Sequence, residues 1–272
     1  MDWCRAPRGR VKVSELRVPM DPFNPGQFFA CCGLFELMAK AAPGACAHFV
    51  ADEARPRRAE FVVEGEALPQ LATVLGALRE ATFELIEEAE ESVWPVRLSI
   101  AGEVFVLDWW LRAFREKPSN LKCWAGQVTT RKLFTDLPRL VEPDGGADRL
   151  MTAAKMSKSK FGVDPRSAWN ALDFGFSPDT QGQDAATYPA VEMLAAVGLQ
   201  GFRPKAERRE GVVRSFFHLW TTPLPLVVAR MGAVVAWDGL PRFDYEFSIS
   251  KRGQSYKYFE LAKFIERKVY SA

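Results

Sequence analysis

Basic and aromatic side chains of types that suit a polyanion gather in the second half of the sequence. Lys155, Lys158 and Lys160 follow one another with only Met and Ser between them, and Arg166 and Trp169 come next. Lys and Arg neutralise phosphate groups, and aromatic rings stack on unpaired bases. Lys155 and Lys158 would share one face if this segment formed a helix. The irregular sequence that follows predicts a packed binding surface, because a long segment does not stay loose inside a compact domain.

Further basic patches follow along the chain. One patch consists of Arg203, Lys205, Arg208, Arg209 and Arg214, and another of Lys251, Arg252, Tyr256, Lys257 and Tyr258 around a predicted hairpin turn. Lys122 and Trp124 in a polar segment, and Arg131 and Lys132 on a predicted helix, are additional candidate contacts. A solvated surface would explain any one patch alone. Three patches in one half of the chain favour nucleic-acid binding.

The sequence carries no recognisable catalytic motif. It lacks a GxxxxGK phosphate loop, a GxGxxG turn and a GxSxG elbow, and its two histidines, His48 and His218, have no neighbours that suggest a triad. One acidic group, Asp244 and Glu246 near Lys251, resembles what a metal-dependent nuclease uses. On an alternating strand these two acids share a face, and we expect that face to be solvated. The chain is therefore expected not to be an enzyme and to hold no metal or cofactor.

Charge is distributed unevenly although the net charge is only +2. Residues 41–107 contain 5 Lys and Arg against 12 Asp and Glu, whereas residues 150–272 contain 17 against 12. Such asymmetry allows one face to meet nucleic acid while another is repelled from it or meets a basic protein. A chance concentration of acidic surface helices in one half remains an equal alternative.

Cysteine usage and hydropathy indicate a cytoplasmic protein. Five cysteines, an odd number, occur without a secretory segment, which favours reduced thiols. No CxxC pair supports a zinc site, and no apolar run reaches membrane-spanning length. We therefore expect no membrane association.

The pattern of apolar residues predicts an α+β fold of short strands, hairpins and helices around a buried N-terminal helix. Strands are expected at 11–19, 47–50, 60–63, 96–100, 104–109, 215–220, 224–228, 243–250 and 255–259, and helices at 26–40, 68–79, 127–140, 188–198 and 263–268. The helix at 26–40 is apolar nearly all round, which is typical of a core helix. The chain is expected to form one unit, 1–272, or two lobes, 1–143 and 147–272, joined by the Pro- and Gly-containing segment 142–146.

Several segments resemble a protein family encoded with CRISPR–Cas systems of subtype I-U, also called I-G. The strongest is DPFNPGQFFACCGLFEL at 21–37. Further matches are LKCWAGQ at 121–127, FGVDPRSAW at 161–169, GFSP at 175–178 and PAVEMLAAVGL at 189–199. The segments extend over much of the chain, so the resemblance is to a whole protein and not to one motif.

The resemblance implies a subunit of a crRNA-guided, Cascade-type effector complex, in the place of a reduced large subunit. Such a subunit would contact guide RNA, double-stranded target DNA near the protospacer-adjacent motif, and the other protein subunits. It implies no catalytic residue. A length of 272 residues is short for a large subunit, which usually carries a helical bundle as well.

The sequence thus leads to one hypothesis and two rivals. The hypothesis is a non-catalytic subunit whose basic C-terminal half touches nucleic acid, with Trp124, Trp169 or Tyr256 stacking on a base. One rival is the metal-dependent nuclease that uses Asp244 and Glu246. The other is a scaffold that binds only protein, through the acidic segment 80–91.

Overall fold

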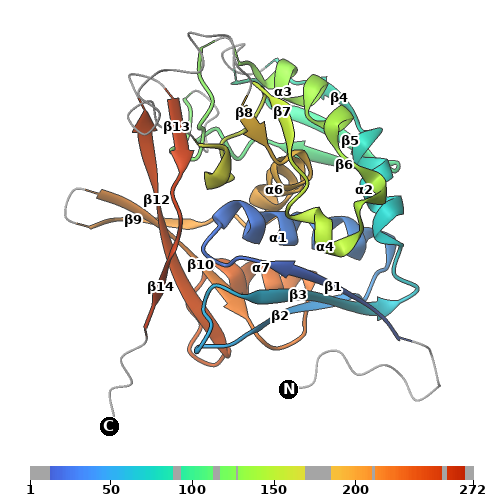
Figure 1. Ribbon diagram of the computed structural model, residues 1–272, viewed down its shortest axis with the longest axis vertical. Coiled ribbons are helices and arrows are strands. Elements are labelled where there is room, and N and C mark those ends of the chain that lie inside the picture. The colour runs from blue at the N-terminus through green and yellow to red at the C-terminus, as the bar shows by residue number, and fades with distance from the viewer. Residues whose placement is uncertain are drawn as a thin grey trace.

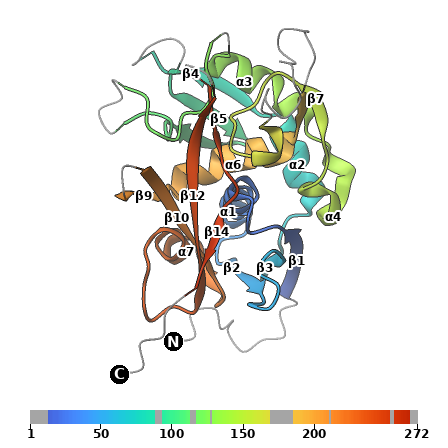
Figure 2. The ribbon, with the colours of Figure 1, turned by 60° about the vertical axis from the view of Figure 1, so that its left-hand side comes forward.

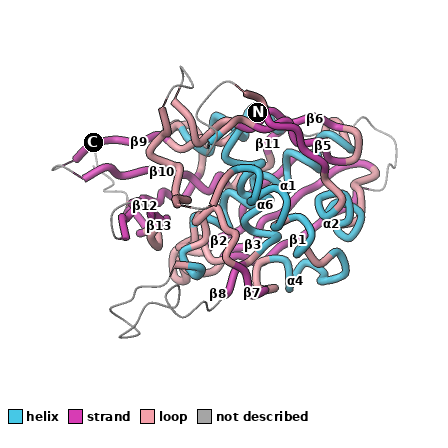
Figure 3. The backbone as a smooth tube through the Cα atoms, turned by 90° about the horizontal axis from the view of Figure 1, so that it is seen from above, coloured by secondary structure: helices cyan, strands magenta, loops and turns pink. Residues whose placement is uncertain are grey.

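Two packed helices, α1 (Pro25–Ala41) and α6 (Pro189–Gly201), form the centre of the molecule, and sheets surround them (Figures 1 and 3). The computed structural model describes residues 13–87, 93–112, 117–126, 128–168, 185–209, 212–252 and 256–266, with the backbone alone at residues 185, 209, 252 and 256. The predicted α+β class is confirmed: the sheets are antiparallel, and both helices of the central pair are buried.

Helix α1 is buried because it is apolar on every side. The Asn24 side chain caps its first turn by accepting a hydrogen bond from the backbone N–H of Gln27 (3.2 Å), and Pro25 supplies a helical φ at the first position. The helix crosses α6 backbone to backbone. A Cβ at Gly33 would lie 1.9 Å from the Leu194 carbonyl oxygen, so only glycine allows this approach.

One sheet covers the lower side of the helix pair in Figure 1. Its order is β1 (Val13–Met20), β3 (Ala59–Glu66), β2 (Cys46–Ala51) and β11 (Leu224–Pro225). Elements from both halves of the chain therefore share a sheet as well as the core. The segment 142–146 is no extended linker, because it forms η3 (Pro143–Gly145) and the start of α4 (Gly146–Leu150).

A second sheet stands at the left of Figure 1. It runs in the order β13 (Tyr256–Phe259), β12 (Arg242–Arg252), β10 (Val212–Trp220) and β9 (Lys205–Arg209), with β14 (Lys263–Ile265) also paired to β12. Its inner face packs aromatic rings onto α1: Phe217 stacks on Phe28 at 4.4 Å and on Tyr245 at 5.4 Å between ring centroids. Helix α7 (Leu226–Val234) follows β11 and packs against β10.

The remaining elements lie above and beside the helix pair in Figures 1 and 2. They are β4 (Thr82–Leu85), β5 (Val96–Ile100), β6 (Glu103–Leu107), α2 (Leu71–Arg79), α3 (Thr130–Asp136), η2 (Pro138–Leu140), β7 (Lys155–Ser157), β8 (Ala185–Thr187) and η4 (Pro165–Ser167). Trp109, Trp110, Trp124 and Phe161 form an aromatic cluster in this region, with Trp109 and Trp124 at 6.0 Å. In the described ranges, no helix is both long and apolar enough to cross a bilayer.

Two expected elements differ from the structure, and one observed strand was not expected. The strand predicted at 224–228 ends at Pro225 and continues as helix α7. In place of the helix predicted at 263–268, the structure has strand β14 over Lys263–Ile265. The acidic segment 80–91, whose sequence predicts no regular element, contains β4.

The cysteines also differ in part from expectation. Cys31, Cys32 and Cys123 are free and buried, as small core residues are. Cys46, by contrast, is disulfide-bonded, which departs from the expectation that every thiol is reduced.

Candidate nucleic-acid interface

The β12–β13 hairpin turns basic where it extends past the core. Phe247 and Phe259 pack together at 4.9 Å between ring centroids. Because side chains alternate along a strand, Lys251 follows Phe247 on the same face of β12, and Lys257 precedes Phe259 on the same face of β13. Lys251 and Lys257 are direct partners in the register. One face of the hairpin is thus apolar over the core and cationic beyond it.

A third lysine reaches this place from a distant part of the chain. The backbone N–H of Lys257 donates to the Cys123 carbonyl oxygen (3.0 Å), which joins β13 to the loop at 121–126. Lys122 directly precedes Cys123, so this hydrogen bond brings its backbone beside β13. Burial raises the pKa of the Cys123 thiol, and the positive charges of Lys257 and Lys122 oppose that rise. Lys122, Lys251 and Lys257 are called the lysine cluster below.

The lysine cluster is accessible to a ligand. Lys251 is exposed, and Lys122 and Lys257 are half-buried. The Lys122 ammonium lies over the Trp124 ring at 5.6 Å, which holds the side chain in place. Three positive charges at one end of the molecule, two of them directly opposed, favour a bound polyanion.

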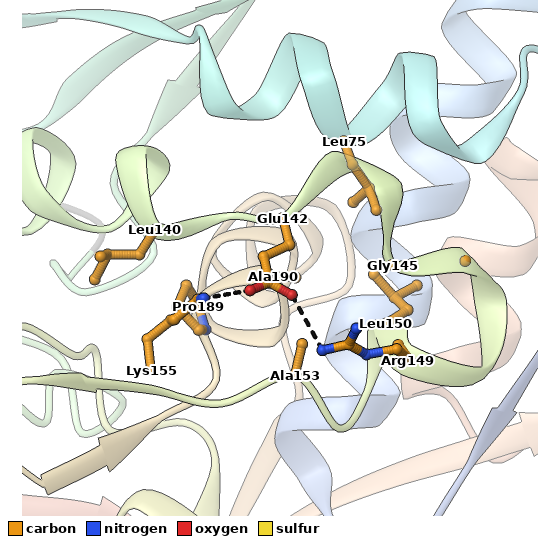
Figure 4. Close-up of a pocket in the computed structure, with 11 residues that line it drawn as sticks. Leu75, Leu140, Glu142, Gly145, Arg149, Leu150, Ala153, Lys155, Pro189 and Ala190 are labelled. Atoms are coloured by element: carbon orange, nitrogen blue, oxygen red, sulfur yellow. Dashed lines mark hydrogen bonds and ion pairs between the residues drawn. The ribbon is translucent and has the colours of Figure 1, made fainter.

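The stretch that begins at Lys155 does not form the continuous basic surface expected from the sequence. It is not helical but forms strand β7. Lys155 pairs with Glu142 beside Arg149, around a cavity of about 10 Å³ (Figure 4). Lys160 is 6% exposed and donates to the Ser167 carbonyl oxygen. Of the three lysines, Lys158 is exposed and Lys155 is half-buried.

The Arg166 side chain is also bound within the protein. Its guanidinium donates to both carboxylate oxygens of Asp164 (3.0 and 2.6 Å) and stacks over the Tyr188 ring at 3.5 Å. Asp164 is fully buried and accepts a further bond from the Asn24 amide (2.9 Å), which ties this loop to the start of α1.

Glu192 anchors the same loop from the first turn of α6. Its carboxylate accepts the backbone N–H groups of Phe161 (2.7 Å), Gly162 (3.1 Å) and Asp164 (3.3 Å). Burial, and then the negative charge of Asp164, raises the pKa of Glu192 to about 7. Sequence reasoning missed this residue, although one carboxylate in an otherwise apolar helix is a detectable signal. The network fixes the loop at 161–168 and thereby supports the neighbouring aromatic cluster.

The β9–β10 hairpin projects from the left side of the molecule in Figure 1 and carries the second basic patch. Three of its cations have acidic neighbours: Arg203 pairs with Asp108 (3.1 Å), Lys205 with Glu207 (3.0 Å), and Arg214 with Glu246. Arg208 is exposed. The side chain of Arg209 lies outside the described residues. The positive charge of this patch is therefore largely balanced by neighbouring carboxylates.

The aromatic residues proposed to stack on bases fare differently. Trp124 is 1% exposed and belongs to the core, so it offers no ring to a base. Trp169 and the side chains of Arg252 and Tyr256 lie outside the described residues. Arg131 and Lys132 are exposed in the first turn of α3 at the upper end of the molecule (Figure 1).

An additional basic turn connects β2 to β3. Arg55, Arg57 and Arg58 are exposed there, and Arg57 lies over the Phe23 ring at 5.1 Å. Arg55 and Arg58 line an open cleft of about 750 Å³ that Arg166 also borders. Sequence reasoning missed this turn because it lies in the acidic half of the chain, although three arginines in four residues mark it.

The acids of the nuclease alternative are neutralised by neighbouring side chains. Asp244 is 9% exposed; its Oδ1 lies 2.7 Å from His218 Nδ1 and accepts a bond from Arg242 Nε (2.9 Å). Glu246 pairs with Arg214. The expectation of a solvated face is therefore corrected. Across the described ranges, no group of three or more His, Cys, Asp and Glu side chains is placed to hold a metal ion.

Comparisons of the chain with models of protein families, with curated proteins and with solved structures found no match.

Proposed function

We propose that this chain is a non-catalytic, nucleic-acid-binding subunit of a crRNA-guided surveillance complex of CRISPR subtype I-U (I-G). The single observation that carries the proposal is the convergence of Lys122, Lys251 and Lys257 from two distant segments at one end of the molecule. Like charges in register are unfavourable by themselves, and a phosphate backbone would offset their repulsion.

The resemblance of the sequence motifs supplies the context of the proposal. In such a complex the chain would contact guide RNA, target DNA near the protospacer-adjacent motif and neighbouring subunits, in the cytoplasm and in defence against viruses. Guide pairing would read the target sequence while protein contacts hold the duplex. The nuclease alternative gains no support from the geometry, because Asp244 and Glu246 are each paired with a cation of the protein.

Co-purification tests the proposal. The tagged chain is expressed with the proteins encoded beside it and a repeat array, and the bound RNA is sequenced. We expect short RNAs of uniform length that carry repeat sequence, together with stoichiometric partner proteins. A chain that purifies alone and without RNA would overturn the assignment, and cleavage of DNA that requires a divalent metal and Asp244 would establish the nuclease in its place.

A further inference from the structure

An apolar stripe runs along the outer side of helix α7. Val227 is 71% exposed, Met231 63% and Val235 50%, at a spacing of four residues, and Trp237 directly beyond them is 54% exposed. The opposite side of the helix, with Ala229, Gly232 and Ala233, is buried. Large apolar side chains that gather in this way on a surface mark an interaction site, whereas single ones do not. We call these four exposed residues the α7 stripe.

Two hydrogen bonds fix the carbonyl oxygen of Trp237. The Arg242 guanidinium donates to the Trp237 carbonyl oxygen, and the Leu240 N–H donates to the same oxygen (3.0 Å). Arg242 is in turn fixed by Asp244, which also binds His218. This network therefore holds the backbone of the turn that carries Trp237. An aromatic anchor that is already ordered binds a partner with little loss of conformational freedom.

The charges of the segment that carries the α7 stripe disfavour an anionic surface as its partner. Arg230 and Asp238 are the only charged residues between positions 222 and 241. Arg230 makes two bonds to the buried Glu36 (2.7 and 2.6 Å). Asp238 is wholly exposed beside Trp237, although Arg242 lies 3.9 Å away. Phosphate groups of a nucleic acid or an anionic membrane would meet the Asp238 carboxylate here, and the one cation of this segment, Arg230, is bound to Glu36.

The same charges argue against a second copy of this chain. In a two-fold pairing the same patch faces itself, so Asp238 would have to find its partner within the α7 stripe and its border. The two cations of that border, Arg230 and Arg242, are already bound to Glu36 and Asp244. Charge complementarity therefore requires a different surface, one that brings its own cation.

We infer that the α7 stripe docks a different protein, one that presents an apolar groove bordered by a Lys or Arg opposite Asp238. Helix α7 lies below β9 and β10 in Figure 2, away from the upper end with α3. The inference rests on the proposed function in so far as a subunit of a complex needs a protein contact as well as a nucleic-acid contact.

The test compares two substitutions that place the same charge on two exposed apolar sites. Met231→Glu lies in the α7 stripe, and the control Val104→Glu lies on β6, where Val104 is 58% exposed. The wild type and each variant are expressed with the proteins encoded beside the gene and a repeat array. Thermal unfolding of each purified chain checks that it folds, and its affinity for labelled RNA and DNA is measured separately.

We expect the amount of one co-purifying protein recovered with Met231→Glu to fall at least tenfold, whereas Val104→Glu should recover as much of it as the wild type does. Both variants should bind nucleic acid with the affinity of the wild type. An unchanged complex with Met231→Glu overturns the inference. The inference is also overturned if sedimentation shows that the wild type is a dimer and that Met231→Glu is a monomer, because a second copy of the chain then covers the α7 stripe. If Met231→Glu loses the partner but the wild type binds no nucleic acid, the result would support the docking surface and contradict the proposed function.

Discussion

Lys251 and Lys257 lie directly opposite each other in the β12–β13 hairpin, two like charges in register at the end of an aromatic core. A pair of opposite sign would stabilise the hairpin there, so the residues are not chosen for stability alone. An anion bound over the two ammonium groups would offset their repulsion.

Replacing one lysine should stabilise the isolated chain. For Lys257→Thr we expect the free energy of unfolding to rise by about 0.5 kcal/mol at low salt, because cross-strand repulsion is removed. High salt should erase the gain, since it screens exposed charges. The measurement is urea unfolding at two salt concentrations. The control is Lys263→Thr on β14, where the register partner is Glu246, and it should give no gain. Equal effects of the two substitutions would refute the repulsion.

Backbone contact between the central helices should make Gly33 irreplaceable. Gly33→Ala places a Cβ 1.9 Å from the Leu194 carbonyl oxygen, which forces α1 and α6 apart, and we expect a loss of about 3 kcal/mol or more in the free energy of unfolding. Gly76→Ala on α2 is the control, because nothing lies within 4 Å of its Cβ. There we expect a gain of about 0.5–1 kcal/mol from helix propensity. A tolerated Gly33→Ala in thermal unfolding would contradict the packing described.

Stability should depend on pH through Glu192. Its pKa is raised from 4.5 to about 7 by burial, so between these values the folded chain keeps a proton that the unfolded chain has lost. The free energy of unfolding should therefore fall as pH rises through this window, by an amount on the order of 3 kcal/mol, with the loss complete above the folded pKa.

Glu192→Gln isolates this contribution, because the amide cannot titrate yet keeps an oxygen for the Phe161 and Gly162 N–H groups. Burial lowers the pKa of His48, so that group changes stability in the opposite direction and cancels only in the difference between the two proteins. Unfolding at pH 5 and pH 8 measures the difference. Parallel pH profiles for wild type and variant would show that Glu192 does not carry the effect.

The sequence predicted the central helix well and the elements at the periphery less well. The run from Pro25 to Ala41 is apolar on every side, and only a buried helix satisfies such a run, so its predicted bounds are within one residue. The run at 224–228 is short and rich in Leu and Val, which strands and buried helices share. Pro225 decides the outcome, because α7 begins directly after it.

The candidate interface could be predicted only in its residue types. Lys122 and Lys257 are far apart in the sequence and meet through the register of β13 and one hydrogen bond to Cys123, which no local pattern reveals. Nor could the sequence show that Lys160 turns inward, because the loop that accepts its bond is held by Glu192 from a distant helix. The pairing of Arg166 with Asp164, two residues away, is by contrast a local contact. Composition indicates which side chains suit a phosphate, whereas tertiary contacts decide which of them are left to bind one.

The salt dependence of nucleic-acid binding tests the central claim most directly. The affinity of the purified chain for labelled RNA and duplex DNA is measured over a range of salt, for the wild type and for a variant with all three residues of the lysine cluster changed to Ala. The control changes Lys40, Arg97 and Lys263, which lie on other elements, to Ala. We predict that the lysine-cluster variant binds more weakly and that its logarithmic salt slope is smaller by about 2–3, because three phosphate contacts are lost. Equal slopes for the wild type, the control and the lysine-cluster variant would contradict the account.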